Sequence, residues 1–376
     1  MINYGKQSIS KDDIKELVKA LKSDFLTQGP AIEIFEKKLS KYCGSKYALA
    51  FNNGTSALHI ANLVLGTKKS KTVATTPITF LATANSVIYC GGKVEFVDIN
   101  DKNFNIDLVS LEDKLKNKNI FGIIIVHLGG ELADIESIRV LAKKYNAWII
   151  EDACHAIGGK WIDSKNTKRI VGDCSYSEIT TFSFHPVKHI TTGEGGAILT
   201  NDKSIYENAK LLRSHGMFKE DKWFKKKPWY YEMRQLGYNY RITDFQAALG
   251  SSQLQKSDKW VKIRSDKVKY YDKKLQKVKQ VIPQEHNFKF INSYHLYIIL
   301  AKNRDKLFLF LKENGVNCQI HYIPIYRQPF YKGLNFNNFP NSEQYYQNGI
   351  SLPLYPSLKK KEQDKIIKLI KDFYRD

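Results

Sequence analysis

Residues 180–200 read TTFSFHPVKHITTGEGGAILT, and this stretch decides the fold class. Its two ends, 180–184 and 197–200, are β-branched and aromatic runs that predict two buried strands. The loop between them carries one lysine, Lys188, together with a proline and three glycines. An amine on a rigid loop between two core strands is desolvated, which favours its use as a nucleophile in a Schiff base with a carbonyl. The alternative is an ordinary surface lysine, because the chain contains 50 lysines.

The segments before this stretch alternate between strand and helix patterns. Short apolar runs predict strands at 47–51, 72–76, 93–98, 121–127 and 147–150. Apolar residues at helical spacing predict helices at 10–21, 32–42, 57–63, 81–89, 108–115 and 135–145. This alternation predicts an α/β fold with a mostly parallel sheet flanked by helices. In such sheets the site lies at the carboxyl ends of the strands, where we expect Ser56, His127, Asp152 and His155.

The C-terminal part predicts a smaller α+β unit. Helices are expected at 205–215, 243–256, 260–277, 305–314 and 361–374, and strands at 294–301 and 316–325. Residues 219–231 and the aromatic segments before the last helix are expected to be loops. We therefore predict a large domain, 1–256, whose N-terminal segment lies near the substrate cleft, and a small C-terminal domain, 257–376.

The net charge leaves two kinds of partner to consider. The chain of 376 residues carries a formal charge of +21, which would suit a nucleic acid. However, 50 of its 59 basic residues are lysine, whereas base and phosphate recognition favours arginine. The lysines are also scattered over predicted helices. We therefore expect a solvated surface without a nucleic-acid partner, and a positive field that favours an anionic small substrate.

The sequence also indicates a compartment. No apolar run reaches the roughly 18 residues of a membrane span, and the first residues lack the apolar core of a signal peptide. The five cysteines are odd in number and form no C-x-x-C pair, which is typical of a reducing environment. We expect a cytoplasmic protein without a membrane segment.

One cofactor would use the polar residues at these strand ends. Pyridoxal 5′-phosphate (PLP) needs a lysine, for which Lys188 is the candidate, and a carboxylate that keeps its ring nitrogen protonated, for which Asp152 is the candidate. It also needs a phosphate cradle and a flat group over its ring. Thr55, Ser56 and Ser183 could form the cradle, and Phe80 could stack on the ring. Taken singly, each residue also has an ordinary structural explanation, as a helix cap, a core aromatic or a strand hydroxyl.

The order of seven motifs resembles the DegT/StrS family of PLP-dependent sugar aminotransferases, which have the aspartate aminotransferase-like (type I) fold. The motifs span the chain: NGTSALH (53–59), TPITF (76–80), VHLGGELADIESI (126–138), EDACHA (151–156), SFHPVKHITTGEGGA (183–197), RSHG (213–216) and GYNYRITDFQAALG (237–250). Within the family, residues 183–196 and 228–244 are most similar to the branch that aminates C4 of a sugar in pseudaminic acid biosynthesis.

The resemblance implies a role for each matching residue. Lys188 would form the Schiff base, Asp152 would bind the pyridine nitrogen, and His155 would lie near the phenolic oxygen. Asn239 would reach across a homodimer to the partner's phosphate, so that two chains share each site. The residues implied to hold the cofactor are Thr55, Ser56, Phe80, Asp152, His155, Ser183, Lys188 and Asn239. Those implied to bind the substrate are Tyr4, Phe25, Leu26, Thr27, Ser56, Asn239, Arg241, Gln319, Ile320, His321 and Tyr322.

For the reaction, the resemblance implies transfer of the amino group of L-glutamate to C4 of a UDP-4-keto-6-deoxy-N-acetylhexosamine, with PLP and its amine form PMP in alternation. The nearest alternative is an aminotransferase for another nucleotide-linked 4-keto sugar, of the bacillosamine or aminoarabinose type. A non-catalytic dimer of the same family and a nucleic-acid-binding protein are the other two alternatives.

Several residues depart from the family pattern or suggest other chemistry. Gly129-Gly130-Glu131 and Cys154 stand where many members have other residues. A dehydratase branch of the family replaces the lysine with histidine, so the presence of Lys188 disfavours that activity. His185 and His189 are four residues apart, but they have no H-E-x-x-H pattern and no cysteine ligand, so we expect no metal site.

Overall fold

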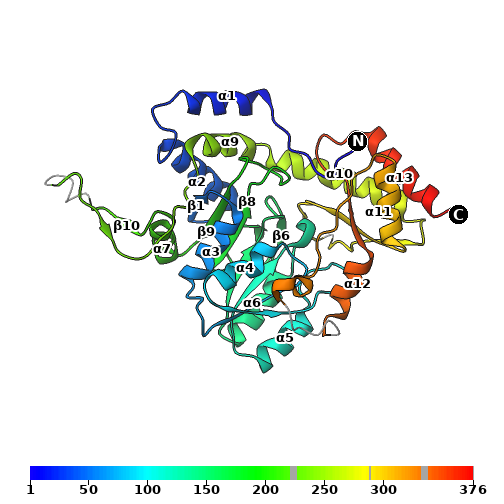
Figure 1. Ribbon diagram of the computed structural model, residues 1–376, viewed down its shortest axis with the longest axis horizontal. Helices are drawn as coiled ribbons and strands as arrows, with labels where there is room; N and C mark the ends of the chain where they lie inside the picture. Colours follow the sequence, from blue (N-terminus) through cyan, green and yellow to red (C-terminus); the bar gives the residue numbers. More distant parts are fainter. Residues whose placement is uncertain (221–226, 288, 332–337, 376) are drawn as a thin grey trace.

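The computed structural model describes residues 1–220, 227–287, 289–331 and 338–375. Figure 1 shows a large body built on a central sheet and a smaller unit beside it, near which both termini lie. Helices α10, α11 and α13 belong to this smaller unit.

The described part of the chain contains one seven-stranded sheet with the order β1-β9-β8-β5-β4-β2-β3. Its strands are β1 (Tyr47–Phe51), β2 (Thr72–Thr75), β3 (Lys93–Phe96), β4 (Ile120–Val126), β5 (Trp148–Asp152), β8 (Ile179–Ser183) and β9 (Gly196–Thr200). β9 runs antiparallel to both of its neighbours, and the other pairs are parallel. Six strands therefore end at one edge of the sheet, where β9 begins.

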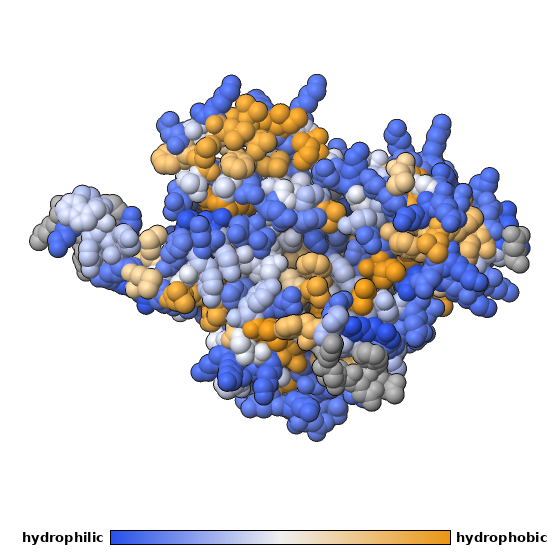
Figure 2. Space-filling model, viewed as in Figure 1, coloured by the Kyte–Doolittle hydropathy of each residue, from blue (hydrophilic) through white to orange (hydrophobic). Residues whose placement is uncertain are grey.

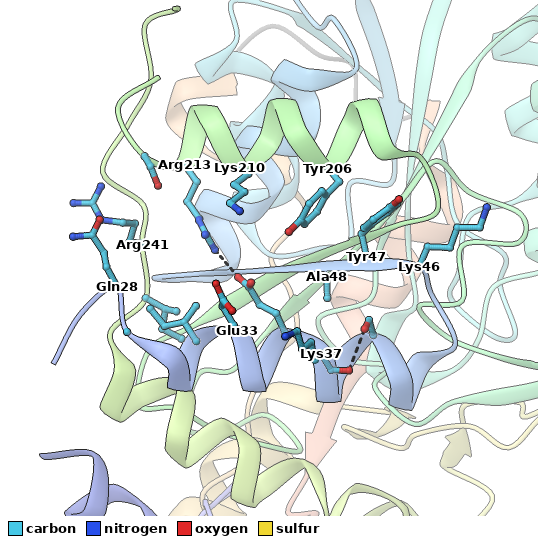
Figure 3. Close-up of a pocket in the computed structure, with 16 residues that line it drawn as sticks. Gln28, Glu33, Lys37, Lys46, Tyr47, Ala48, Tyr206, Lys210, Arg213 and Arg241 are labelled. Atoms are coloured by element: carbon cyan, nitrogen blue, oxygen red, sulfur yellow. Dashed lines mark hydrogen bonds and ion pairs between the residues drawn. The ribbon is translucent and has the colours of Figure 1, made fainter. Parts of the chain in front are cut away.

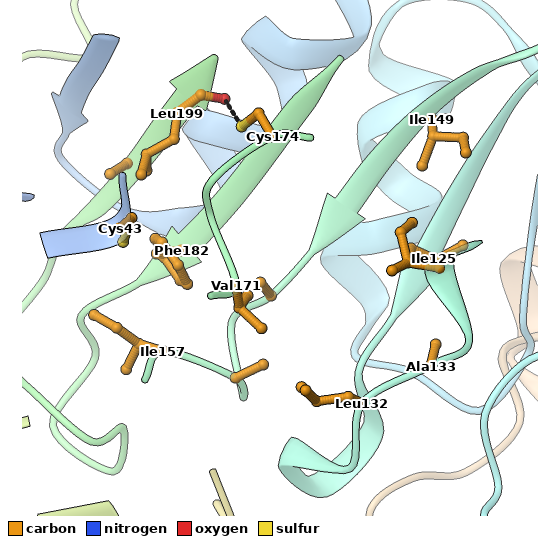
Figure 4. Packing of buried hydrophobic residues seen from close by; sticks show 14 of the residues in the cluster. Cys43, Ile125, Leu132, Ala133, Ile149, Ile157, Val171, Cys174, Phe182 and Leu199 are labelled. Carbon is orange, nitrogen blue, oxygen red and sulfur yellow. Dashed lines mark hydrogen bonds between the residues drawn. The ribbon is translucent and has the colours of Figure 1, made fainter. Parts of the chain in front are cut away.

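Helices cover both faces of this sheet. They are α2 (Pro30–Cys43), α3 (Gly54–Val64), α4 (Leu81–Tyr89), α5 (Leu108–Asn117), α6 (Ile135–Lys144), α7 (Lys203–Arg213) and α9 (Asp244–Leu254), while α1 (Lys11–Leu21) packs on α9. Successive strand residues point to opposite faces, so that Ile123 packs in one core and Ile124 in the other. The first core includes α2, α5, α6 and α9, and Figure 4 shows part of it; the second includes α3, α4 and α7. The predicted parallel sheet between helices is confirmed.

The smaller unit has its own sheet and core. Its strands, in the order β12-β13-β14, are β12 (Val281–Pro283), β13 (Tyr297–Ala301) and β14 (Gly349–Leu352). Its helices are α10 (Ser257–Leu275), α11 (Arg304–Glu313), α12 (Pro340–Asn348) and α13 (Lys360–Phe373). Trp260 of α10 packs in a core of the large sheet, whereas Tyr271 and Leu275 pack in the core of the small unit. This helix therefore connects the two units, and a domain boundary near 256 stays a prediction.

Two local predictions were wrong. Residues 316–325 do not form a strand: Val316 and Gln319 each make one isolated bridge, and a 3-10 turn begins at Ile325. Pro324 has no N–H to continue a ladder, and the segment instead leaves the sheet. The aromatic segment before the last helix is not all loop, because it contains α12 and β14.

Short hairpins were also missed. β6 (Lys160–Ile162) pairs with β7 (Lys168–Ile170), and β10 (Met217–Phe218) pairs with β11 (Glu232–Met233). β10 and β11 lie directly before and after the predicted loop 219–231, of which residues 221–226 lie outside the described residues.

Helix α1 docks on the body through polar side chains and leaves apolar ones exposed. Its capping residue Ser10 and the buried Asp13 form a capping box, and Asp13 also accepts hydrogen bonds from residues of α9 and from Lys256. Ile14, Val18 and Leu21 are 53%, 41% and 50% exposed. Figure 2 shows the resulting apolar patch over α1. A patch of this kind is typical of a surface that another molecule covers.

Candidate active site

The carboxyl edge of the large sheet opens into a cavity of about 690 Å³. β5 ends at Asp152, β8 ends at Ser183, and α3 begins three residues after β1. The opposite wall comes from the small unit, which contributes His295 and the segment 319–322, while Tyr4 comes from the N-terminal segment. The cavity therefore lies where the sequence predicts a site, and two units enclose it.

Lys188 lies in this cavity on the loop between β8 and β9. Hydrogen bonds from Phe184 N–H to the Gly195 carbonyl (2.8 Å) and from Thr192 N–H to the Phe184 carbonyl (3.0 Å) close the loop. Burial lowers the pKa of the Lys188 amine below its ordinary 10.5, although Cys154 and Asp152 oppose this shift. Because a neutral amine is the nucleophilic and basic form, the environment suits a reactive lysine.

The Asp152 carboxylate is held from one side. Its Oδ2 accepts a hydrogen bond from the Thr83 hydroxyl at 2.7 Å, and its Oδ1 accepts the Cys154 N–H at 3.3 Å. Thr83 itself lies 2.8 Å from the hydroxyl of Thr79. Asp152 is 6% exposed and lines the cavity. A buried carboxylate in this position can accept a charge-assisted hydrogen bond from a protonated ring nitrogen.

His155 is enclosed by residues of both units. Gly129 N–H donates to its Nδ1 at 3.3 Å, its Nε2 lies 3.3 Å from the Tyr322 hydroxyl, and its ring centroid lies 4.4 Å from that of His295. Burial holds the pKa of His155 well below 6.5, and the Lys188 charge acts in the same direction. The ring is therefore neutral, and since Nδ1 accepts, Nε2 carries the proton that faces Tyr322.

The beginning of α3 forms an anion cradle against the end of β8. Asn53 caps the helix by accepting the Ser56 N–H at 2.8 Å, and the first-turn N–H groups of Gly54 and Thr55 have no acceptor within the helix. A Cβ at Gly54 would lie 3.0 Å from the Cβ of Ser183, so glycine keeps the cradle open. The Ser56 hydroxyl instead donates to Asn53 at 3.0 Å.

The structure brings together eleven of the predicted site residues and leaves six outside. The residues that line the cavity are Tyr4, Thr55, Phe80, Asp152, His155, Ser183, Lys188, Gln319, Ile320, His321 and Tyr322. Those that do not line it within this chain are Phe25, Leu26, Thr27, Ser56, Asn239 and Arg241. His127, also expected at this edge, faces away and binds Glu151, with 3.1 Å between its Nε2 and a carboxylate oxygen.

Sequence reasoning missed several residues that line the cavity: Asn53, Thr79, Thr83, Glu194 and His295. Thr79 and Thr83 have helical spacing at the start of α4, which hints at one face, whereas His295 gave no signal because it precedes an apolar strand. His185 lines the cavity but is separate from His189, whose Nε2 donates to the Ser293 carbonyl at 2.8 Å. Among the described residues, no group of three His, Cys, Asp or Glu side chains could hold a metal ion.

A second cavity of about 480 Å³ lies between α2, β1 and α7, and Figure 3 shows its lining. Arg213 crosses it to reach Glu36, with 2.6 Å between Nη1 and Oε1. Arg241 lies here rather than beside Lys188.

The first cavity fits PLP by its own geometry. A lysine with a lowered pKa, a buried carboxylate with an oxygen available to a ring nitrogen, and a helix N-terminus kept open by glycine are the groups that this cofactor requires. Fold and site together define a PLP-dependent enzyme of the type I, aspartate aminotransferase-like fold.

The chain belongs to the DegT/DnrJ/EryC1/StrS aminotransferase family, whose model matches residues 7–371. It is 40% identical to UDP-4-amino-4,6-dideoxy-N-acetyl-beta-L-altrosamine transaminase of Campylobacter jejuni subsp. jejuni, over 99% of this chain and 96% of the relative. The protein of the same name from Helicobacter pylori is 36% identical over 94% of this chain and 93% of the relative.

Solved structures agree with this assignment. Helicobacter pylori PseC, an aminotransferase involved in the biosynthesis of pseudoaminic acid, has a TM-score of 0.90 at 33% identity, with 99% of each chain covered. Spr1654 from Streptococcus pneumoniae in its PMP form has a TM-score of 0.91 at 26% identity, over 99% of this chain and 98% of that one. The protein is therefore a PLP-dependent sugar aminotransferase, as the sequence predicted. No helix in the described ranges is long and apolar enough to cross a bilayer.

Proposed function

We propose that the protein transfers the amino group of L-glutamate to C4 of a UDP-4-keto-6-deoxy-N-acetylhexosamine, a step of pseudaminic acid biosynthesis. The observation that carries the proposal is the Lys188 cavity in a chain whose relatives, at 36% and 40% identity, are named as transaminases of the corresponding 4-amino altrosamine sugar. The cavity volume of about 690 Å³ suits a cofactor with a sugar beside it.

The chain's own residues would divide the chemistry as follows. Asp152, fixed through Thr83, holds the ring nitrogen of the cofactor, and the first turn of α3 with Ser183 holds the phosphate. When bound, PLP supplies an electron sink for the carbon that loses its proton. The Lys188 amine removes the proton from Cα of glutamate and, after 2-oxoglutarate has left, delivers a proton to C4 of the sugar.

The substrate cleft would be bounded by the small unit. Tyr4 and His321 have ring centroids 5.5 Å apart, and the Phe80 and Tyr322 rings are 6.0 Å apart. Phe80 is 57% exposed, so its ring is available to a flat ligand. These rings offer apolar faces and hydroxyls to a nucleotide sugar.

We also propose a homodimer that shares its sites, in the cytoplasm. Phe25 and Leu26 are about half exposed, and with Asn239 they lie outside the Lys188 cavity of their own chain, which supports contact with a partner's site. The helix α1, which carries the apolar patch, ends at Leu21, just before Phe25 and Leu26 in the sequence. The five cysteines, all within the described residues, are free thiols, which supports a reducing compartment.

A direct assay tests the reaction. Purified protein with PLP, L-glutamate and the UDP-linked 4-keto sugar should release 2-oxoglutarate and form the 4-amino sugar. Lys188→Ala should keep the fold but lose turnover and the lysine-dependent absorbance band, whereas Lys203→Ala, an exposed lysine, should behave like the parent. Turnover only with a bacillosamine- or aminoarabinose-type 4-keto sugar would favour that alternative, and normal turnover by Lys188→Ala would refute the role of this lysine.

A further inference from the structure

One oxygen of the Asp152 carboxylate is in contact with a buried pair of hydroxyl groups at the cavity wall. Thr83 Oγ1 lies 2.7 Å from Asp152 Oδ2 and 2.8 Å from Thr79 Oγ1. Thr79 is 3% exposed, Thr83 is fully buried and Asp152 is 6% exposed. Bulk water therefore cannot replace either hydrogen bond.

The donor direction along this chain of groups follows from proton counting. A hydroxyl has one proton, and the Thr83 hydroxyl donates it to the Asp152 carboxylate. In the contact between the two threonines, Thr83 must then accept and Thr79 must donate. Such a chain polarises each hydroxyl toward the carboxylate and strengthens the last hydrogen bond.

Thr83 is itself fixed at the start of α4. Its N–H donates to the Phe80 carbonyl at 3.2 Å, and its carbonyl accepts the Ser86 hydroxyl at 2.8 Å. Ser86 in turn accepts from the Asn62 amide of α3 at 3.0 Å. The hydroxyl that touches Asp152 is thus anchored by two helices rather than by a mobile loop.

We propose that Thr79 and Thr83 are positioning residues for the cofactor: they hold Oδ2 of Asp152, so that Oδ1 is presented to the ring nitrogen. Without the Thr83 hydroxyl only the longer hydrogen bond from the Cys154 N–H to Oδ1, at 3.3 Å, would hold the carboxylate, and its orientation toward the ring nitrogen would be less fixed. This inference rests on the proposed role of Asp152, but not on the identity of the sugar.

The test compares Thr83→Val, which removes the hydroxyl at nearly the same volume, with Thr83→Ser, which keeps it. Thr200→Val is the matched control, because Thr200 is also buried and its hydroxyl donates to the Glu178 carbonyl at 2.8 Å without lining the cavity. Each variant is saturated with PLP. The readouts are the absorbance spectrum of the bound cofactor from pH 6 to 9, the dissociation constant of PLP, and turnover.

We expect Thr83→Val to fold, to shift the absorbance profile with pH, and to lose about 10- to 100-fold in turnover, the range for a hydrogen bond to a charged group. Thr83→Ser should restore both readouts, Thr79→Val should show a smaller effect, and Thr200→Val none. An unchanged spectrum and turnover in folded Thr83→Val, or a Thr83→Ser variant as impaired as Thr83→Val, would overturn the proposal. A separate variant, Asp152→Asn, tests the role of Asp152 on which the proposal rests. An unchanged cofactor spectrum in this variant would refute that role.

Discussion

Replacement of Arg213 by methionine is the sharpest test of what holds the N-terminal strand in place. Arg213 is 8% exposed, and its Nη1 donates to Glu36 Oε1 at 2.6 Å and to the Ala50 carbonyl at 2.7 Å. The same Glu36 oxygen accepts the Ala50 N–H at 2.8 Å. The pair therefore fastens β1, which leads directly into the cradle at Asn53, to both α2 and α7 (Figure 3).

The expected cost follows from the charge that remains. Methionine preserves most of the apolar stem but leaves the Glu36 carboxylate buried without a cation, and breaking a buried pair in this way costs about 3–5 kcal/mol. Because the pair borders a cavity of about 480 Å³, water can reach the carboxylate, and we expect the lower value, ~3 kcal/mol. Adding Glu36→Gln to this variant removes the unpaired buried charge, and the amide oxygen of the glutamine can still accept the hydrogen bond from the Ala50 N–H. The double variant should lose only ~1 kcal/mol.

The assay is urea unfolding followed by tryptophan fluorescence, at one protein concentration and one PLP concentration, because cofactor binding and dimerisation both shift apparent stability. Arg213→Met, Glu36→Gln and the double variant complete the cycle with the parent protein, and their midpoints give the coupling free energy between the two side chains. An Arg213→Met variant within about 1 kcal/mol of the parent, or a double variant less stable than Arg213→Met, would show that this pair does not hold β1 in place.

Three further predictions concern pH, the cradle and assembly. Burial lowers the pKa values of His155 and His295 well below 6.5 and that of His189 to about 3. As the pH falls, these histidines take up protons in the unfolded chain before they do so in the folded protein, so this contribution to stability is fully present above about pH 6.5 and is lost below it. His189→Gln should reduce the slope of unfolding free energy against pH by about 1.4 kcal/mol per pH unit, measured by urea titrations at several pH values. Gly196→Ala would place a Cβ 2.5 Å from the Asn53 carbonyl oxygen and should weaken PLP binding in a titration. The control is Gly193→Ala, whose Cβ would meet no atom within 4 Å. It should cost only ~1 kcal/mol of stability, because Gly193 has a positive φ, and should leave PLP affinity unchanged. Val18→Asp on α1 should lower the mass measured by light scattering toward that of a monomer. The control is Val109→Asp, because Val109 on α5 is the same residue type and is 79% exposed, and this variant should keep the mass of the parent. An unchanged mass for Val18→Asp would place the partner elsewhere.

Much of the architecture follows from local patterns. Period-two and helical spacing encode which face of each element is buried, so the alternation of strands and helices and the predominantly parallel sheet were predictable. The positions of Lys188 and Asp152 followed as well, because parallel strands end at one edge, where Asp152 ends one strand and Lys188 lies on the loop after another. The motif resemblance supplied their chemistry, and the family match confirms the class of enzyme.

Local patterns failed where a segment's environment comes from distant parts of the chain. Residues 316–325 have the composition of a strand, yet their few bridges are to the N-terminus and to β14. Asn239 and Arg241 belong to a motif that the resemblance connects with the site, but within one chain they lie apart from Lys188. Their neighbours are set by packing between elements far apart in sequence, which periodicity does not record.

By itself, the sequence determined the elements, the edge of the sheet that bears the site, and the lysine and carboxylate placed there, because these depend on residue type and short-range spacing. Only the tertiary structure decided which groups surround them: Thr83 from α4 beneath Asp152, and His295 and Tyr322 from the small unit against His155. Those contacts require two helical layers and two units to close on one cavity, and so they exist only after long-range packing has fixed the distances between their atoms.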